Sequence, residues 1–339
     1  MRRFVTRRRL LAGGAIVVMA IAGGAYLRHR RWRAFETLPR EASEGTSNEG
    51  WTLPAGDRIP DGGCPPVERG APGPADAGAL TRFAVIGDFG FAGPDEEAVA
   101  DLVKAARPEF VVTLGDNNYP LGAADTIDVN IGLFYHDYIA PYVGRFGCGA
   151  TRNRFFPSLG NHDWMTTGAR PYLDYFELPG NERYYDVAWG AVSLFAIDSD
   201  PSEPDGNTAD SAQAAWLRRE LAASTAPWKI VYFHHAPYSS GPHGSAIGLR
   251  WPFKAWGADL VLAGHDHDYE RFAIDGLTYV VNGLGGAVFY PLGTPVSGSV
   301  ARFNLAAGAL FVEASATSLH ARFATVGGRD VDTFALAKP

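Results

Sequence analysis

The sequence is poor in cysteine: its 339 residues contain only Cys64 and Cys148, and no Cys-x-x-Cys pair occurs. The absence of such a pair argues against a zinc site built from thiolates. In an oxidising compartment the two cysteines would form one disulfide, whereas elsewhere they would remain two buried thiols. Both alternatives stay open at the level of the sequence.

Positive charge is scarce beyond the N-terminus. The net charge is −7, and residues 1–33 hold nine arginines and no acidic residue, which leaves −16 on the rest of the chain. Nucleic-acid binding depends on lysine and arginine side chains that neutralise phosphates, so we expect no such binding. A hydrophobic content of 46% with 20% charged residues is typical of a globular protein and excludes wholesale disorder.

Long apolar runs are also rare, and the longest spans residues 10–27, between two arginine clusters. This order is typical of an export signal or a signal anchor. Residues 6–11, Thr-Arg-Arg-Arg-Leu-Leu, resemble the twin-arginine motif of export substrates. We therefore expect export to the periplasm, the cell surface or the medium by the export machinery. The run is just long enough to span a bilayer, and no clear Ala-x-Ala site follows it. Cleavage and membrane anchoring through residues 10–27 thus both stay open.

Composition and periodicity divide the chain into four segments. These are an export signal or anchor at 1–33, a Pro- and Gly-rich linker or N-terminal arm at 34–80, one α/β domain at 81–328 and a C-terminal tail at 329–339.

Within the α/β domain, β-rich runs at 82–88 and 109–116 flank helical spacing at 94–106, which predicts a parallel βαβ unit. A hairpin through Trp189-Gly190, followed by a buried strand, makes the predicted architecture mixed and not purely parallel. Residues 211–224 predict an amphipathic helix whose inward positions are Ala215, Leu217 and Leu221.

Polar residues capable of binding metal or transferring protons follow five of the apolar strands. They are Asp88, Asp116, Asn161-His162-Asp163, His234-His235 and the pair His265 and His267. Ligands of α/β sheets bind beyond the carboxyl ends of the strands, so these groups are expected to converge. Carboxylate, amide oxygen and imidazole suit Fe, Mn or Zn. The set is too large for one tetrahedral site and indicates two metals bridged by a carboxylate.

The ordered motifs make the prediction specific. They are Gly87-Asp88, Gly115-Asp116-Asn117-Asn118-Tyr119, Gly160-Asn161-His162-Asp163, His235-Ala236-Pro237 and Gly264-His265-Asp266-His267. Over residues 82–325 this series resembles the metallophosphoesterases of the calcineurin-like superfamily, and more closely the purple acid phosphatases. Most of the superfamily has Asp-x-His at the first motif. This chain lacks that histidine and has Tyr119 three residues after Asp116, the tyrosine that binds ferric iron in purple acid phosphatases.

The resemblance implies a four-layer αββα sandwich with a dinuclear metal centre at the carboxyl ends of the strands. The first metal would be Fe(III), with Fe, Zn or Mn as the second. The implied ligands are Asp88, Tyr119 and His267 for the first metal, Asp116 as the bridge, and Asn161, His235 and His265 for the second. The spacing to Pro237 favours His235 as the ligand over His234, which would then lie behind the ligands or face the substrate.

Three further residues are candidates for catalysis by the same resemblance. His162 would contact phosphate and protonate the leaving group, and Asp163 would orient His162, since a carboxylate partner fixes the tautomer of a histidine. His243, eight residues after His235, is either a second histidine on the substrate side or an ordinary loop residue. Asp266 lies between two candidate ligands, and the alternation of an extended segment predicts that it faces away from the metals.

The activity that the resemblance implies is hydrolysis of a small phosphate monoester by metal-activated hydroxide, as in an acid phosphatase. A phosphodiesterase or nucleotide hydrolase with the same centre is the enzymatic alternative. A non-catalytic surface protein that binds phosphate or metal is the other alternative. The complete ligand set and the intact His162 argue against this last reading.

Overall fold

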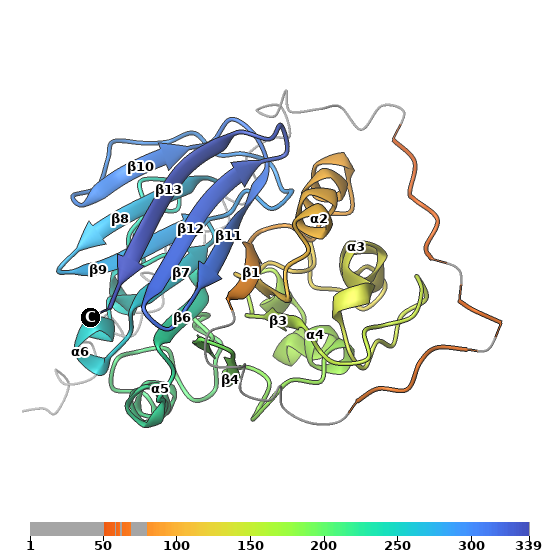
Figure 1. Cartoon of the computed structure of the whole chain (residues 1–339), viewed down its shortest axis with the longest axis horizontal. Coiled ribbons are helices and arrows are strands. Elements are labelled where there is room, and N and C mark those ends of the chain that lie inside the picture. Colours follow the sequence, from red (N-terminus) through yellow and green to blue (C-terminus); the bar gives the residue numbers. More distant parts are fainter. Residues whose placement is uncertain (1–50, 58, 62, 69–79, 339) are drawn as a thin grey trace, which may run out of the picture. The chain divides into compact units, whose positions relative to one another are not determined.

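The computed structural model describes residues 51–57, 59–61, 63–68 and 80–338 (Figure 1). The predicted export signal or anchor lies outside the described residues. Within the described ranges, no helix has both the length and the apolar character needed to cross a membrane.

The strands of the described residues form two sheets. The first sheet has the order β13-β12-β11-β1-β2-β3. Its strands are β1 (Thr81–Ile86), β2 (Phe110–Thr113), β3 (Phe155–Pro157), β11 (Gly308–Ala314), β12 (Ser318–Thr325) and β13 (Asp330–Ala337). The second sheet has the order β10-β8-β9-β7-β6-β5-β4. Its strands are β4 (Tyr185–Trp189), β5 (Val192–Ala196), β6 (Trp228–His235), β7 (Leu260–Gly264), β8 (Tyr269–Ile274), β9 (Leu277–Asn282) and β10 (Ser299–Phe303).

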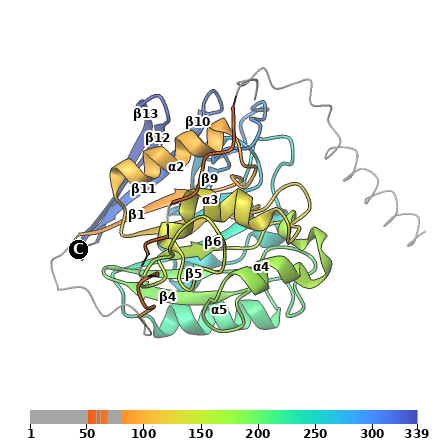
Figure 2. The ribbon, with the colours of Figure 1, turned by 90° about the vertical axis from the view of Figure 1, so that its right-hand side faces the viewer.

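Helices cover the outer side of each sheet (Figure 2). Helix α2 (Pro94–Ala106) packs against β11 of the first sheet, and α3 (Leu133–Tyr135) packs against α2. The other helices are α4 (Arg170–Tyr175), α5 (Ala212–Ala223) and α6 (Phe253–Trp256), with short helical turns at Asp128–Gly132, His136–Tyr138, Asp163–Met165, Thr167–Ala169 and Ile247–Leu249. The predicted αββα sandwich is confirmed.

The alternation of side chains in β6 explains the layers. Ile230 and Tyr232 belong to the core between the two sheets, whereas Val231 and Phe233 pack with Leu217 and other residues of α5 and α6. A strand that is buried on both faces alternates between two cores because successive side chains point to opposite sides. The central strands β6 and β7 therefore read as nearly continuous apolar runs.

The predicted βαβ unit and hairpin are both present. Strands β1 and β2 pair in parallel, and β4 and β5 pair antiparallel around Trp189. In α5 the buried residues include Leu217 and Leu221 as predicted, but Ala214 is buried in place of Ala215. The helix starts after its N-cap Ser211, and Ala214 and Leu217 then lie one turn apart on the inner stripe.

Residues 329–339, which we expected to be a tail, contain strand β13, which pairs with β12 along its length. Asp332 of β13 also binds Arg271 of β8, with Nε 2.6 Å from Oδ2, and it accepts a hydrogen bond from Tyr269. The first sheet thus extends past residue 328, and one ion pair ties its last strand to the second sheet.

The described part of the N-terminal arm is fastened to the domain. Cys64 and Cys148 form a disulfide, so the alternative of two free thiols is wrong. The amide of Asp57 donates to the carbonyl of Phe146, and the indole of Trp51 donates to Glu97 of α2. The arm therefore packs along the helical side of the first sheet.

Candidate metal centre

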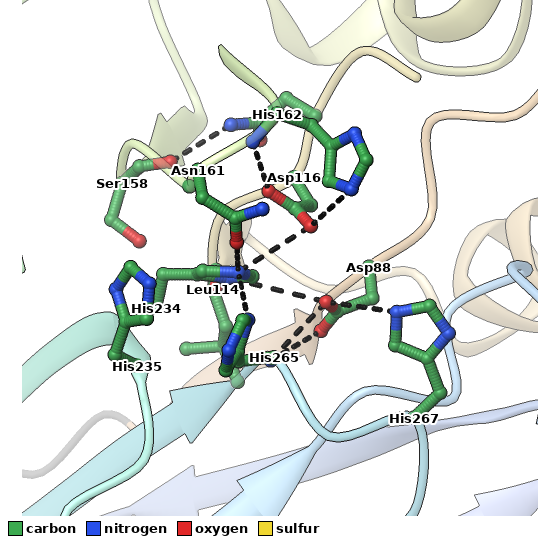
Figure 3. Close-up of polar contacts among 12 residues, drawn as sticks. Asp88, Leu114, Asp116, Ser158, Asn161, His162, His234, His235, His265 and His267 are labelled. Atoms are coloured by element: carbon green, nitrogen blue, oxygen red, sulfur yellow. Dashed lines mark hydrogen bonds and ion pairs between the residues drawn. The ribbon is translucent and has the colours of Figure 1, made fainter. Parts of the chain in front are cut away.

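The candidate residues meet at one edge of the two sheets (Figure 3). Asp88 follows β1, Asp116 follows β2, and Asn161 follows β3. His234 is the last residue but one of β6, and His265 and His267 follow β7. Because β1, β2 and β3 run parallel, as do β6 and β7, the carboxyl ends of these strands lie at the same edge.

The backbone turns sharply at this edge. Asp88, Asp116 and His265 have φ values of 55°, 52° and 73°, in the left-handed region that residues other than glycine seldom adopt. Strained conformations of this kind cluster at functional sites. The glycine before Asp116 is required as well: Gly115 has φ 87°, and a Cβ there would lie 2.7 Å from Cβ of His234.

One group of ligand atoms surrounds the phenol of Tyr119. Its Oη lies 2.9 Å from Oδ2 of Asp116 and 3.1 Å from Nε2 of His267. Oδ1 of Asp88 lies 3.4 Å from both Tyr119 Oη and His267 Nε2. Burial, Asp116 and Asp88 raise the pKa of Tyr119 well above its usual value, so in the metal-free chain the phenol donates to the carboxylates. A bound cation reverses this preference and favours the phenolate.

The second group of ligand atoms surrounds His234. Its Nε2 lies 2.9 Å from Oδ1 of Asn161, 3.0 Å from Nδ1 of His265 and 3.4 Å from Oδ2 of Asp116. On its other side, Nδ1 donates to the carbonyl of Leu114 at 2.8 Å. A carbonyl only accepts, so this bond fixes the ring with Nε2 toward the centre.

The electrostatics of the centre favour a cation. Burial alone would lower the pKa of His234, but Asp116 and Asp88 raise it to about 10. Burial alone would raise the pKa of Asp116, but His234 and His162 hold it well below its usual range. In the metal-free chain a proton on His234 therefore balances the carboxylates, a position that a metal ion can take instead.

The two adjacent histidines both lie at this centre. His234 makes the contacts with Asn161, His265 and Asp116. Nδ1 of His235 lies 2.9 Å from Oγ of Ser199, and its ring lies 4.4 Å from that of His265. Strand alternation does not separate the two rings, because the pairing of β6 with β7 shifts register before His235. The choice of His235 over His234 as the metal ligand stays a prediction.

His162 reaches the centre from the loop after β3. Its amide donates to Oδ1 of Asp116 at 2.9 Å, and its Nε2 lies 3.9 Å from Oδ2 of the same carboxylate. Its side chain is 20% exposed and its ring lies 4.4 Å from that of Tyr119. Nδ1 donates to the carbonyl of Pro120 at 2.6 Å, which leaves Nε2 on the side of Asp116.

Asp163 does not orient the ring of His162, contrary to our expectation. Its Oδ2 accepts hydrogen bonds from the amide of Gly160 at 2.8 Å and from Nδ2 of Asn117 at 2.8 Å. Burial, with the charge of Asp116 added, raises the pKa of Asp163 to about 6. Asp163 therefore fixes the loop between β2 and β3, and Pro120 holds the histidine ring.

His243 lies beside the second group. Its ring stacks on that of His265 with centroids 4.1 Å apart, and its amide donates to Oδ1 of Asp266 at 2.9 Å. Burial, then the nearby His267, lowers the pKa of His243 to about 4. Asp266 itself is turned away from Asp116, since its other oxygen accepts from Ser239 Oγ.

Tyr290 is a residue of the centre that sequence reasoning missed. Its ring stacks on His267 with centroids 4.1 Å apart and planes at 4°, and it lies 5.4 Å from His243. Its amide donates to the carbonyl of His267, while Nδ1 of that histidine donates to the carbonyl of Val288 at 2.6 Å. The position of Tyr290 follows from the parallel pairing of β7 with β9, because this pairing brings the loop after β9 to the same edge.

The residues present fit two cations. Ligand atoms of Asp88, Asp116 and His267 all lie within 4.8 Å of one another, and these three residues are buried. The Asn161 and His234 group contributes an amide oxygen and imidazole nitrogens. Carboxylate, phenol and imidazole suit Fe(III), and the second set suits Fe, Zn or Mn. Asp116 lies within 3.4 Å of both groups.

A family model described as calcineurin-like phosphoesterase matches residues 81–269. Purple acid phosphatase 17 of Arabidopsis thaliana is 28% identical over 251 residues, which cover 62% of this chain and 70% of the relative. Tartrate-resistant acid phosphatase type 5 of Rattus norvegicus is 25% identical over 243 residues, which cover 60% of this chain and 72% of the relative.

Solved structures share the fold. The purple acid phosphatase PPD1 of yellow lupin superposes with a TM-score of 0.63 at 18% identity, covering 79% of this chain and 55% of the lupin chain. GAP50, the anchor in the inner membrane complex of Plasmodium, superposes with a TM-score of 0.60 at 20% identity, covering 77% of this chain and 89% of that chain.

Proposed function

The chain belongs to the calcineurin-like phosphoesterase family and is a purple acid phosphatase-like, metal-dependent hydrolase of phosphoric esters, and we propose that it cleaves phosphate monoesters. The observation that carries the proposal is the position of Tyr119, whose phenol oxygen lies 2.9 Å from Asp116 and 3.1 Å from His267. The first motif has no histidine, and we propose that this phenol serves as the ligand in its stead.

The proposed ligands follow from the two groups of atoms. Asp88, Tyr119 and His267 would hold the first metal, Fe(III), and Asp116 would contribute to both metals. Asn161, His265 and one of the two adjacent histidines, His234 by its contacts, would hold the second metal, Fe, Zn or Mn. When bound, the ions would activate water and polarise the phosphoryl oxygens.

The side chains of the chain itself would complete the reaction. The oxygen of a water molecule would form a bond to phosphorus while the bond from phosphorus to the ester oxygen breaks. The water releases one proton to solvent, and the ester oxygen takes one proton from a side chain, so that an alcohol and inorganic phosphate leave. His162 is placed to give that proton from Nε2, because its Nδ1 is fixed on the carbonyl of Pro120. His243, which stacks on His265, would line the substrate side of the second metal.

We also propose that the protein acts outside the cytoplasm on small, soluble phosphate esters. The disulfide between Cys64 and Cys148 suits an oxidising compartment, and residues 1–33 have the pattern of an export signal or anchor. The net charge of −16 on residues 34–339 disfavours nucleic acids as partners or substrates.

The test compares p-nitrophenyl phosphate with bis(p-nitrophenyl) phosphate as substrates of the metal-loaded protein. Faster turnover of the monoester is expected. Faster turnover of the diester would make the enzyme a phosphodiesterase. No turnover of either ester, by protein with two bound metals, would favour a binding role.

A further inference from the structure

Four exposed apolar side chains belong to segments that hold the metal centre. Each is between 41% and 57% exposed, and together we call them the apolar rim: Phe91, Leu121, Met165 and Val288. Single exposed apolar residues are normal on protein surfaces. Several around one site indicate a binding surface instead.

Two rim residues contact the group of candidate ligand atoms around Tyr119. The ring of Phe91 lies 6.1 Å from the ring of Tyr119, edge to face. The carbonyl of Val288 accepts the hydrogen bond from Nδ1 of His267 at 2.6 Å. The positions of Phe91 and Val288 are therefore set by the proposed ligands of the first metal.

The other two rim residues lie in segments that form hydrogen bonds with His162. Leu121 follows Pro120, whose carbonyl holds Nδ1 of His162 at 2.6 Å. The amide of Met165 donates to the carbonyl of His162 at 3.2 Å. His162 is the group that we place beside the ester oxygen, so Leu121 and Met165 lie in the segments nearest to the leaving group.

The rim segments lack the positively charged side chains that would bind a substrate with more than one phosphate. Residues 89–93, 119–123, 163–167 and 286–290 contain no lysine or arginine. A second phosphate, as in a nucleotide or a sugar bisphosphate, is bound in proteins mainly by such side chains. An apolar group gains instead from the removal of its surface from water.

We propose that the apolar rim binds the organic group of the substrate, so that the enzyme prefers phosphate monoesters of alcohols with an alkyl chain or an aryl ring. The inference rests on the proposed monoesterase function and adds the substrate class to it. The metal centre and His162 act on the phosphoryl group, which every monoester shares. Selectivity among monoesters then lies with the rim.

The test is a series of straight-chain alkyl phosphates, from ethyl to hexyl phosphate, compared by kcat/KM. Their leaving groups have similar acidity, so chemical reactivity stays constant along the series. We expect kcat/KM to rise by about two- to fourfold for each methylene that reaches the rim. Equal values along the series would overturn the proposal.

A variant with both Leu121→Ser and Val288→Ser is expected to flatten this rise. The matched control carries Leu80→Ser and Val300→Ser, which are 41% and 53% exposed. Leu80 precedes β1, at the opposite end of that strand from Asp88, and Val300 lies on the edge strand β10. A rise that persists in the rim variant would contradict the proposal.

Two sources of an apolar phosphate monoester can be separated. Phenyl phosphate represents a soluble ester, and vesicles of phosphatidylcholine with phosphatidic acid represent a membrane lipid. Dependence of either rate on Leu121 and Val288 supports the rim as the binding surface. If the wild-type protein hydrolyses no monoester at all, the proposed function fails. If it hydrolyses all of them with values of kcat/KM that do not depend on the alkyl chain of the substrate, only the rim proposal fails.

Discussion

Nε2 of His234 lies 2.9 Å from Oδ1 of Asn161, across the interface between the two sheets. Both atoms point to one position, which Asp116 and His265 also face. The neighbouring His235 has Nδ1 2.9 Å from Oγ of Ser199 and its ring 4.4 Å from that of His265. We therefore propose His234, which contacts Asn161, Asp116 and His265, as the histidine of the second metal site.

His234→Ala should lose the second metal, whereas His235→Ala should keep it. Removal of a residue that hydrogen-bonds a metal ligand lowers metal affinity or activity about 10–100-fold. Removal of the ligand itself should therefore lower kcat at least about 100-fold. Metal analysis after dialysis, together with kcat, checks this. Full metal content in His234→Ala with loss of metal in His235→Ala would reverse the assignment.

His162→Ala should lower kcat by about 10²- to 10⁴-fold for alkyl phosphates, since their leaving oxygen needs a proton. The loss should be much smaller for p-nitrophenyl phosphate, because nitrophenolate leaves without protonation. Asp163→Asn is the companion variant. It should retain the difference between substrates, because Pro120 and not Asp163 holds the ring of His162. Equal losses for both substrates in His162→Ala would exclude His162 as the proton donor.

Tyr290→Leu should weaken binding of the first metal by about tenfold, because the stacked ring and its neighbour Val288 orient His267. Tyr290→Phe keeps the ring and should restore wild-type affinity. Titration of the metal-free protein with metal measures both values. Equal weakening in the two variants would show that the hydroxyl of Tyr290, and not the stacking of its ring, supports metal binding.

Asp332→Asn should destabilise the protein by about 1 kcal/mol at neutral pH, because it breaks the paired hydrogen bonds from Arg271. Against the effect of burial, Arg271 and Tyr269 lower the pKa of Asp332 below its usual value of 3.8. The folded state therefore gains stability above the pKa of the unfolded chain, and this gain disappears as the pH falls through the lower, folded value. Thermal unfolding from pH 7 down to pH 3 should show the two proteins converging. A constant difference over that range would contradict the role of the ion pair.

The sequence was sufficient to place Asp88, Asp116 and Tyr119 together, because parallel strands deliver their carboxyl ends to one edge. It was not sufficient to choose between His234 and His235. Both rings reach His265, because the pairing of β6 with β7 shifts register before His235. Which of the two meets Asn161 depends on how the sheets stack. Strand β13 was missed because Asp330–Ala337 lacks a continuous apolar run, and its side chains are exposed or half-buried, as suits an edge strand.

Contacts between distant loops could also not be predicted from the sequence. The carbonyl of Pro120 holds the ring of His162, and backbone carbonyls carry no signal in the residue types. Tyr290 stacks on His267 from a loop without a motif, and only the pairing of β7 with β9 explains its position. Such contacts require the three-dimensional arrangement of the loops.

The most direct test of the proposed centre is the visible absorption spectrum of the purified, iron-loaded protein, recorded with metal analysis for the wild type and for Tyr119→Phe. We predict a charge-transfer band from Tyr119 to Fe(III) and two metals per chain in the wild type. We predict that the band disappears in Tyr119→Phe while the far-ultraviolet circular dichroism stays unchanged. A colourless iron-loaded wild type, or a band that persists in Tyr119→Phe, would contradict the iron–tyrosinate site.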